Sequence, residues 1–166
     1  MRRAWAQGAA FLRYRPLARP VAVPLADLQV RWRSHPFFAD AVTLDTAATP
    51  NQPIRISGMV VRTGPPGDST PDRFQAVCLR CPHEGCDVEF VSDPKALPPE
   101  VVAEAGHPIT EPVYVCPCHN STFTAEAGER LAGPAPRGLY RFRVTSVTEA
   151  AVEIGEVEED LLLFTL

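Results

Sequence analysis

Two short loops, residues 81–86 and 116–121, constrain this 166-residue chain more than any other feature of its sequence. They hold four of its five cysteines and two of its four histidines. Each loop offers one thiol and one imidazole at close spacing, Cys81-x-His83 and Cys116-x-x-His119, so each can supply two ligands to one metal centre. Each loop also keeps one further cysteine, Cys86 and Cys118. We therefore expect the fold to bring the two loops together.

The residue types alone leave the kind of centre open. Two thiolates and two imidazoles would satisfy a tetrahedral zinc ion, but the two remaining thiols would then have no ligand role. A scaffold that uses the cysteines only for disulfides is a second alternative. The pairing of both loops with a Gly-Pro-Ala-Pro segment at 133–136 makes either alternative a minor one.

Both loops resemble those of the Rieske iron–sulfur family, in the branch found in quinol-oxidising cytochrome bc and bf complexes. That branch carries Cys-Thr-His-Leu-Gly-Cys in its first loop and Cys-Pro-Cys-His-Gly-Ser in its second. This chain matches both, with Pro82 in place of Thr, Glu84 in place of Leu and Asn120 in place of Gly. The resemblance implies one [2Fe-2S] cluster.

The resemblance also implies a role for each loop cysteine and histidine. One iron would be bound by Cys81 and Cys116, and the other by His83 and His119, while Cys86 and Cys118 would form a disulfide that ties the loops together. The implied fold is all-β and mostly antiparallel, with a base domain of β-sheets, a smaller inserted cluster-binding subdomain and one short helix. We expect a Rieske domain over residues 21–166, the subdomain at about 78–137, and a basic N-terminal arm at 1–20.

The implied ligand set has a chemical consequence. Two neutral imidazoles in place of two thiolates raise the potential of a [2Fe-2S] centre into a range of roughly −150 to +300 mV. An imidazole also has a second ring nitrogen that can carry a proton. Uptake of an electron and uptake of a proton can therefore be coupled, and His119 and His83 are the candidate residues for this step, His119 being the expected contact for quinol.

Residues next to the ligands are expected to tune the potential. The resemblance implies that Ser121 donates a hydrogen bond to a cluster sulfur, and that Gly133-Pro134-Ala135-Pro136 forms a rigid third wall beside the cluster. Members of higher potential carry a tyrosine donor where this chain has Phe123, and Glu84 adds a negative charge. We therefore predict a potential below that of the ubiquinol-oxidising members, suited to menaquinol or another low-potential donor.

Hydrophobic alternation and turn residues predict the local structure. The expected strands are 21–24, 54–62, 74–80, 87–91, 112–115, 139–144, 151–154 and 161–165, with turns at 25–28 and 145–150. Residues 31–52 show no clean period and are predicted to be irregular, with at most one short strand. Proline, an acidic first turn and a closing glycine predict a short helix at 98–106.

Three further groups outside the loops have simpler expected roles. Cys78, within an apolar strand, is expected to be a small buried hydrophobic residue. Surface or structural roles are expected for His35 and His107. The 29 residues from Asp87 to Val115 form an excursion that we expect beside the cluster tip, either touching a partner or, the reading we favour, as a plain surface addition.

Charge and hydropathy bear on localisation. The net charge of −4 gives no reason to expect nucleic-acid binding. No stretch has the 18 or so apolar residues of a membrane-spanning helix, so we expect attachment to a membrane through partners, through an anchor not seen here, or through the arginine-rich arm. The run after Arg2-Arg3 is too broken for an export signal. The implied disulfide nevertheless predicts the periplasmic, extracytoplasmic side of a membrane.

Three functions are compatible with these features. The expected one is the electron-transfer subunit of a quinol-oxidising complex, with cytochrome b-type and c-type subunits as partners. The small subunit of a molybdenum oxidase such as arsenite oxidase, which would relay electrons without binding quinol, is the alternative. A cytoplasmic Rieske ferredoxin is disfavoured by the spare cysteines. The sequence has no nucleophile-and-base arrangement, so any enzyme activity is expected to belong to a larger complex.

Overall fold

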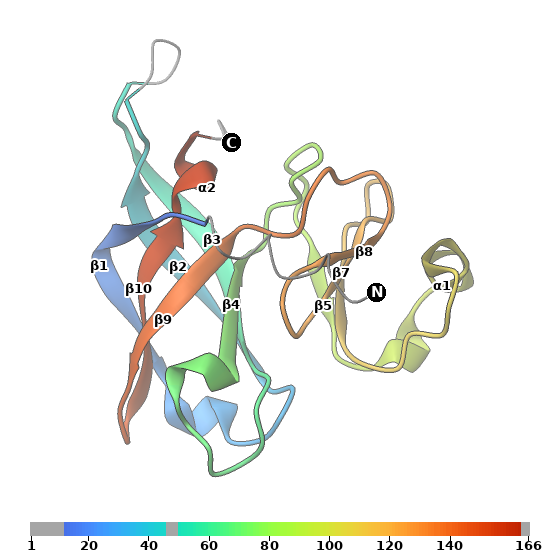
Figure 1. The fold of residues 1–166 in the computed structure, drawn as a ribbon, viewed down its shortest axis with the longest axis horizontal. Helices are drawn as coiled ribbons and strands as arrows, with labels where there is room; N and C mark the ends of the chain where they lie inside the picture. The colour runs from blue at the N-terminus through green and yellow to red at the C-terminus, as the bar shows by residue number, and fades with distance from the viewer. Residues whose placement is uncertain (1–11, 46–49, 164–166) are drawn as a thin grey trace, which may run out of the picture.

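The computed structural model describes residues 12–45 and 50–163 and consists of two antiparallel β-sheets that lie side by side (Figure 1). The strands are β1 Tyr14–Pro24, β2 Ser34–Val42, β3 Pro53–Arg62, β4 Phe74–Cys78, β5 Glu89–Val91, β6 Val113–Val115, β7 Thr122–Thr124, β8 Arg130–Ala132, β9 Arg141–Val147 and β10 Ala151–Glu158. The helices are α1 Pro99–Ala105 and α2 Glu159–Leu163, with single 3-10 turns η1 Leu25–Leu28, η2 Pro71–Arg73 and η3 Pro94–Ala96. The predicted all-β, antiparallel class is confirmed.

The larger sheet forms the base of the molecule. Its six strands are hydrogen-bonded in the order β1-β10-β9-β4-β3-β2, and the two edge strands, β1 and β2, lie close to each other. Each strand contributes inward residues to one core, which includes Val23, Phe37, Ile56, Phe142 and Ile154. The base is therefore a sheet curled around a single apolar interior.

The smaller sheet carries the two ligand loops. Its four strands are ordered β5-β6-β7-β8 and lie within the range expected for the cluster-binding subdomain. Alternation along β6 divides its side chains between two clusters: Tyr114 joins the core that contains Cys81 and Cys116, whereas Val113 and Val115 face the opposite side.

Helix α1 covers that opposite side of the small sheet. Its Val101 is buried together with Leu97, Val113 and Val115, and the left-handed Gly106 ends the helix, as the sequence predicts. The helix therefore lies on the face away from the ligand thiols, at the right of Figure 1, rather than beside the cluster tip. The segment between the loops completes the core of the small sheet.

Strand β4 connects the two sheets. Phe74, Ala76 and Cys78 point into the base core, while Val77 points into the core shared with the ligand loops, which confirms the predicted alternation. The strand ends at Cys78, three residues before the first ligand. The first loop thus leaves directly from a strand that is buried on both faces.

The prediction of an irregular segment at 31–52 is wrong. Residues Ser34–Val42 form β2, a nine-residue strand paired along its whole length with β3. Its inward residues Phe37, Ala39 and Ala41 are apolar, but two of its outward residues, Phe38 and Val42, are apolar and exposed as well. Apolar residues on both faces hide the period of two that would have revealed the strand.

The ends of the base domain also differ from prediction. Strand β1 begins at Tyr14, inside the segment assigned to the basic arm, and it tolerates Pro16 and Pro20 because it is an edge of the hydrogen-bonded order with an irregular register between Pro16 and Val21. The rest of the predicted arm, residues 1–11, lies outside the described residues.

The predicted strand at 161–165 is instead the short helix α2, with residues 164–165 outside the described part. Leu161 and Leu162 are adjacent and both buried, which a strand with one buried face cannot achieve. The turn predicted at 145–150 is shorter, because β9 continues to Val147. Among the described residues, none of the helices has the length and apolar character needed to cross a membrane.

Candidate metal centre

The two ligand loops have the same backbone design. In the first, the Cys81 N–H donates to the Cys86 carbonyl at 2.8 Å and the Gly85 N–H donates to the Cys81 carbonyl at 2.9 Å. In the second, the Cys116 N–H donates to the Ser121 carbonyl at 2.8 Å and the Asn120 N–H donates to the Cys116 carbonyl at 2.9 Å. The fifth residue of each loop is left-handed. Asparagine tolerates this conformation, which explains how Asn120 replaces the family's glycine.

A disulfide joins the two loops. Cys86 and Cys118 are bonded to each other, 32 residues apart in sequence and with 6.6 Å between their Cα atoms, and the predicted pairing is confirmed. Within the described chain this leaves Cys78, Cys81 and Cys116 as free thiols, all buried. The Cys116 sulfur lies within 4.8 Å of both disulfide sulfurs, yet these sulfurs are bonded to each other and cannot act as thiolate ligands.

The thiol side of the centre is buried. Cys81 and Cys116 lie together in the core between the two sheets. Burial raises the pKa of the Cys81 thiol, while hydrogen bonds from the His83 backbone N–H and the Ser121 hydroxyl act in the opposite direction and favour the thiolate. Binding of a metal centre must therefore displace the proton that burial favours on the Cys81 thiol.

The proline loop, residues 133–136, forms the third wall. The Ala135 N–H donates to the Ser121 Oγ at 3.0 Å, and Ala135 itself is buried. Gly133 has a φ of +87°, and a Cβ there would lie 2.4 Å from the Ser121 Cα. Only glycine permits this approach. Ser121 thus accepts a hydrogen bond from the proline loop on its hydroxyl and one from the Cys116 N–H on its carbonyl.

The imidazole side faces solvent. The rings of His83 and His119 meet edge to face with 4.9 Å between their centroids. His119 is the more exposed of the two, with 49% of its side chain accessible. Glu84 joins them, its carboxylate 3.9 Å from the His119 Nδ1. The structure therefore places two thiols inside and two imidazoles outside, at the tips of tied loops.

Comparison with known proteins identifies the family. The model of the Rieske [2Fe-2S] domain matches residues 51–146, more than half of the chain. The chain belongs to the Rieske [2Fe-2S] domain family. Among solved structures, the chain is similar to the cyanobacterial plasma membrane Rieske protein PetC3 from Synechocystis PCC 6803, with 23% identity, coverage of 70% of this chain and 84% of that chain, and a TM-score of 0.39. A comparison with curated proteins found no match.

The donor set of this Rieske domain fits the family's single [2Fe-2S] cluster. The buried thiols Cys81 and Cys116 would hold one iron, and His83 and His119 would hold the other, since soft sulfur donors and imidazoles are the ligands of such centres. When bound, the cluster takes up and gives up one electron. Ser121, the buried core and the proline loop exclude water from the sulfur side, whereas the two imidazoles keep contact with solvent.

Replacing Ser121 with alanine should lower the midpoint potential. The hydroxyl that favours the thiolate form of Cys81 would be lost, and loss of a donor to a ligand sulfur destabilises the more negative, reduced state. A hydrogen bond to a charged acceptor contributes about 1.5–3 kcal/mol, so for a one-electron couple we expect a fall of about 65–130 mV in a redox titration followed by EPR. An unchanged potential would show that the hydroxyl does not act on the cluster.

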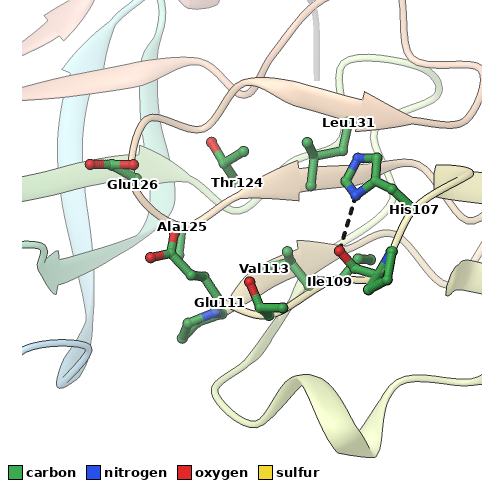
Figure 2. A pocket seen from close by; sticks show the side chains of 11 residues that line it. His107, Ile109, Glu111, Val113, Thr124, Ala125, Glu126 and Leu131 are labelled. Atoms are coloured by element: carbon green, nitrogen blue, oxygen red, sulfur yellow. Dashed lines mark hydrogen bonds between the residues drawn. The ribbon is translucent and has the colours of Figure 1, made fainter.

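The remaining residues that the sequence singled out lie away from the centre. Cys78 is fully buried in the base core, and burial raises its pKa to about 12, as expected of an inert structural thiol. His35 lies at the start of β2, and its Nδ1 is 3.1 Å from the Asp27 carboxylate. His107 lines a cavity of about 160 Å³ together with Ile109 and Leu131 (Figure 2). None of the predicted metal ligands lines this cavity.

Sequence reasoning missed two features of the site. The Tyr114 hydroxyl is buried without a hydrogen-bond partner among the described residues, in the same core as the ligand thiols. Its position in the predicted strand, two residues before Cys116, was the available signal, because extended residues two apart point to the same side. Arg137, which follows the proline loop, is paired with Glu158, 21 residues away, and nothing in the local sequence marks this contact.

Proposed function

We propose that this Rieske electron-transfer domain serves as the iron–sulfur subunit of a quinol-oxidising complex that delivers electrons to a c-type cytochrome or a similar acceptor. The partners would be cytochrome b-type and c-type subunits, and attachment to the membrane would come through them or through an anchor. The observation that carries the proposal is the pair of imidazoles, His119 exposed and His83 half-buried, on loops whose ligand thiols are buried.

His119 is suited to bind the quinol. It is the more exposed ring, so its nitrogen that is not used for iron can accept a hydrogen bond from a quinol hydroxyl and then hold the proton. His83 packs against it at 4.9 Å and limits how far the ring can turn. The rigid loops supply orientation, because each is closed by its own hydrogen bonds and both are tied by the disulfide.

The disulfide supports an extracytoplasmic location. Disulfides persist in oxidising compartments such as the periplasm and are rare in the reducing cytosol. The Cys86–Cys118 bond therefore favours a membrane complex with its Rieske domain on the outer face over a cytoplasmic ferredoxin.

Glu84 favours a second candidate function. Its carboxylate is 61% exposed beside His119, where the quinol-oxidising branch has an apolar leucine. An acidic tip suits electron relay to a partner protein better than contact with an apolar quinol. The second candidate is therefore the small subunit of a molybdenum oxidase such as arsenite oxidase, which transfers electrons without a quinol.

Affinity purification of the full chain from its native membranes distinguishes the two candidates. We expect haem b to co-purify in a fixed ratio to the chain, molybdenum to be absent, and reduction by quinol to be blocked by quinol-site inhibitors. Co-purification of molybdenum without haem b would refute the first candidate and support the second.

Phe123 provides a test of the proposed low potential. It is fully buried in the core that holds both ligand thiols and pairs with Tyr114 across β6 and β7. The Phe123→Tyr variant should raise the midpoint potential, because it restores the donor of the higher-potential members. Wild type should titrate below tyrosine-bearing ubiquinol-oxidising members, and a wild-type midpoint equal to theirs would refute the match to a low-potential donor.

A further inference from the structure

A buried carboxylate stands at the end of β10. Glu158 is fully buried, and both of its oxygens have a donor: the Arg137 Nη2 donates to Oε1, and the Arg141 backbone N–H donates to Oε2 at 3.0 Å. A buried charge is costly unless it is paired and hydrogen-bonded. The buried Glu158 carboxylate therefore needs the Arg137 guanidinium at this position to balance its charge.

Arg137 is held on its other sides as well. Its Nη1 lies 3.5 Å from the Asp160 carboxylate, and its guanidinium lies 4.2 Å from the centroid of the Tyr140 ring. Its side chain is only 30% exposed. The arginine thus joins the segment after the proline loop to β10 and α2 of the base domain.

The same arginine lies two residues from the hydrogen bond that orients Ser121. Ala135 donates its N–H to the Ser121 Oγ at 3.0 Å, and only Pro136, with its fixed φ, separates Ala135 from Arg137. Ser121 in turn contacts the second ligand cysteine, because its carbonyl accepts the Cys116 backbone N–H at 2.8 Å. A continuous series of contacts therefore leads from the base domain to a ligand of the metal centre.

We propose that Arg137 is a positioning residue for the cluster: by pairing with Glu158 it holds the proline loop against Ser121 and so keeps the Ser121 hydroxyl in a fixed orientation beside the ligand loops. Without the pair, the proline loop is free to move and the hydroxyl loses its fixed orientation. This inference concerns the cluster and applies whether the chain belongs to a quinol-oxidising complex or to a molybdenum oxidase. The purification experiment can therefore refute the quinol-oxidising complex while the Arg137 experiment still succeeds.

Arg143 offers a matched control. Like Arg137 it pairs with an acidic residue of β10, its Nη1 lying 2.8 Å from the Glu156 carboxylate, and its guanidinium lies 4.0 Å from the centroid of the Tyr14 ring. It belongs to β9 and has no contact with the proline loop among those described. Arg137→Gln and Arg143→Gln therefore remove similar interactions, and only the first should reach the cluster.

The test uses the cluster-loaded full chain. For Arg137→Gln we expect amide hydrogen exchange over residues 133–138 to accelerate roughly tenfold or more, and the midpoint potential to fall, as in Ser121→Ala but by less. Arg137→Lys, which keeps the charge, should recover part of both changes. In a Ser121→Ala background, Arg137→Gln should leave the potential unchanged, because the two residues act in series.

A second variant covers the case that Arg137→Gln does not fold. The double variant Arg137→Gln/Glu158→Gln leaves no unpaired buried charge and should show the same two changes. The proposal is overturned if the exchange and the potential of the variants match those of wild type, if Arg143→Gln shifts the potential equally, or if the Arg137 and Ser121 effects on the potential simply add.

Discussion

The Cys116→Ala chain should fold but contain no [2Fe-2S] cluster. Cys116 is buried beside Cys81 and would supply one of only two thiolates, and no other free thiol of the described chain lies in that core. We expect iron and acid-labile sulfide to fall below a tenth of the wild-type content, with the far-ultraviolet circular dichroism unchanged. The reason is that a metal centre that lacks one of its protein ligands loses most of its metal-binding free energy.

Matched controls come from the chain itself. Cys78→Ala removes another fully buried free thiol, and His107→Ala removes another histidine, but neither residue lies at the centre. Both variants should keep the full iron and sulfide content, whereas His119→Ala should lose it. Retention of the cluster in Cys116→Ala, or its loss in Cys78→Ala, would contradict the ligand assignment.

Removal of the disulfide should be the second large effect. The Cys86→Ser/Cys118→Ser double variant frees two loops that are 32 residues apart in sequence. The loop-closure entropy predicts a loss of about 3–4 kcal/mol in the free energy of unfolding. For a chain of this size, this corresponds to a melting temperature lower by roughly 10 °C. Cluster loss during incubation in air should also be faster.

Both cysteines must be replaced in this experiment. The Cys116 sulfur lies within 4.8 Å of both disulfide sulfurs, so a single replacement would leave a thiol able to form a new disulfide with a ligand. The comparison is calorimetry of the double variant against wild type and Cys78→Ala. A melting temperature equal to that of wild type would show that the loops are held together without the bond.

The sequence predicted the disulfide and the Rieske type of the centre because the signals for both lie within two short loops. Ligand spacing within each loop, the glycine that ends α1 and the alternation along β4 each depend on a few consecutive residues. Strand β2 and helix α2 were predicted wrongly because their apolar residues do not follow the period of their element. In both β2 and α2, contacts with distant parts of the chain decide which side chains are buried, and the local sequence does not reveal these contacts.

Apart from the disulfide, which the resemblance implied, long-range side-chain pairs could not be predicted from the sequence. The short strands β7 and β8 have three residues each and are defined mainly by their partners, so their own sequence carries little signal. The pair formed by Arg137 and Glu158 joins the proline loop to the last strand of the base. No local pattern distinguishes Glu158 from the neighbouring Glu156 and Glu159, although only Glu158 is buried.

The most direct test of the whole account is metal analysis of the purified chain, combined with pulsed EPR of its dithionite-reduced form. We predict two irons and two labile sulfides per chain, and hyperfine couplings from two coordinated imidazole nitrogens in the reduced wild-type chain. A single zinc atom per chain, or an iron–sulfur signal without nitrogen coupling, would contradict a centre with buried sulfur and exposed imidazole ligands.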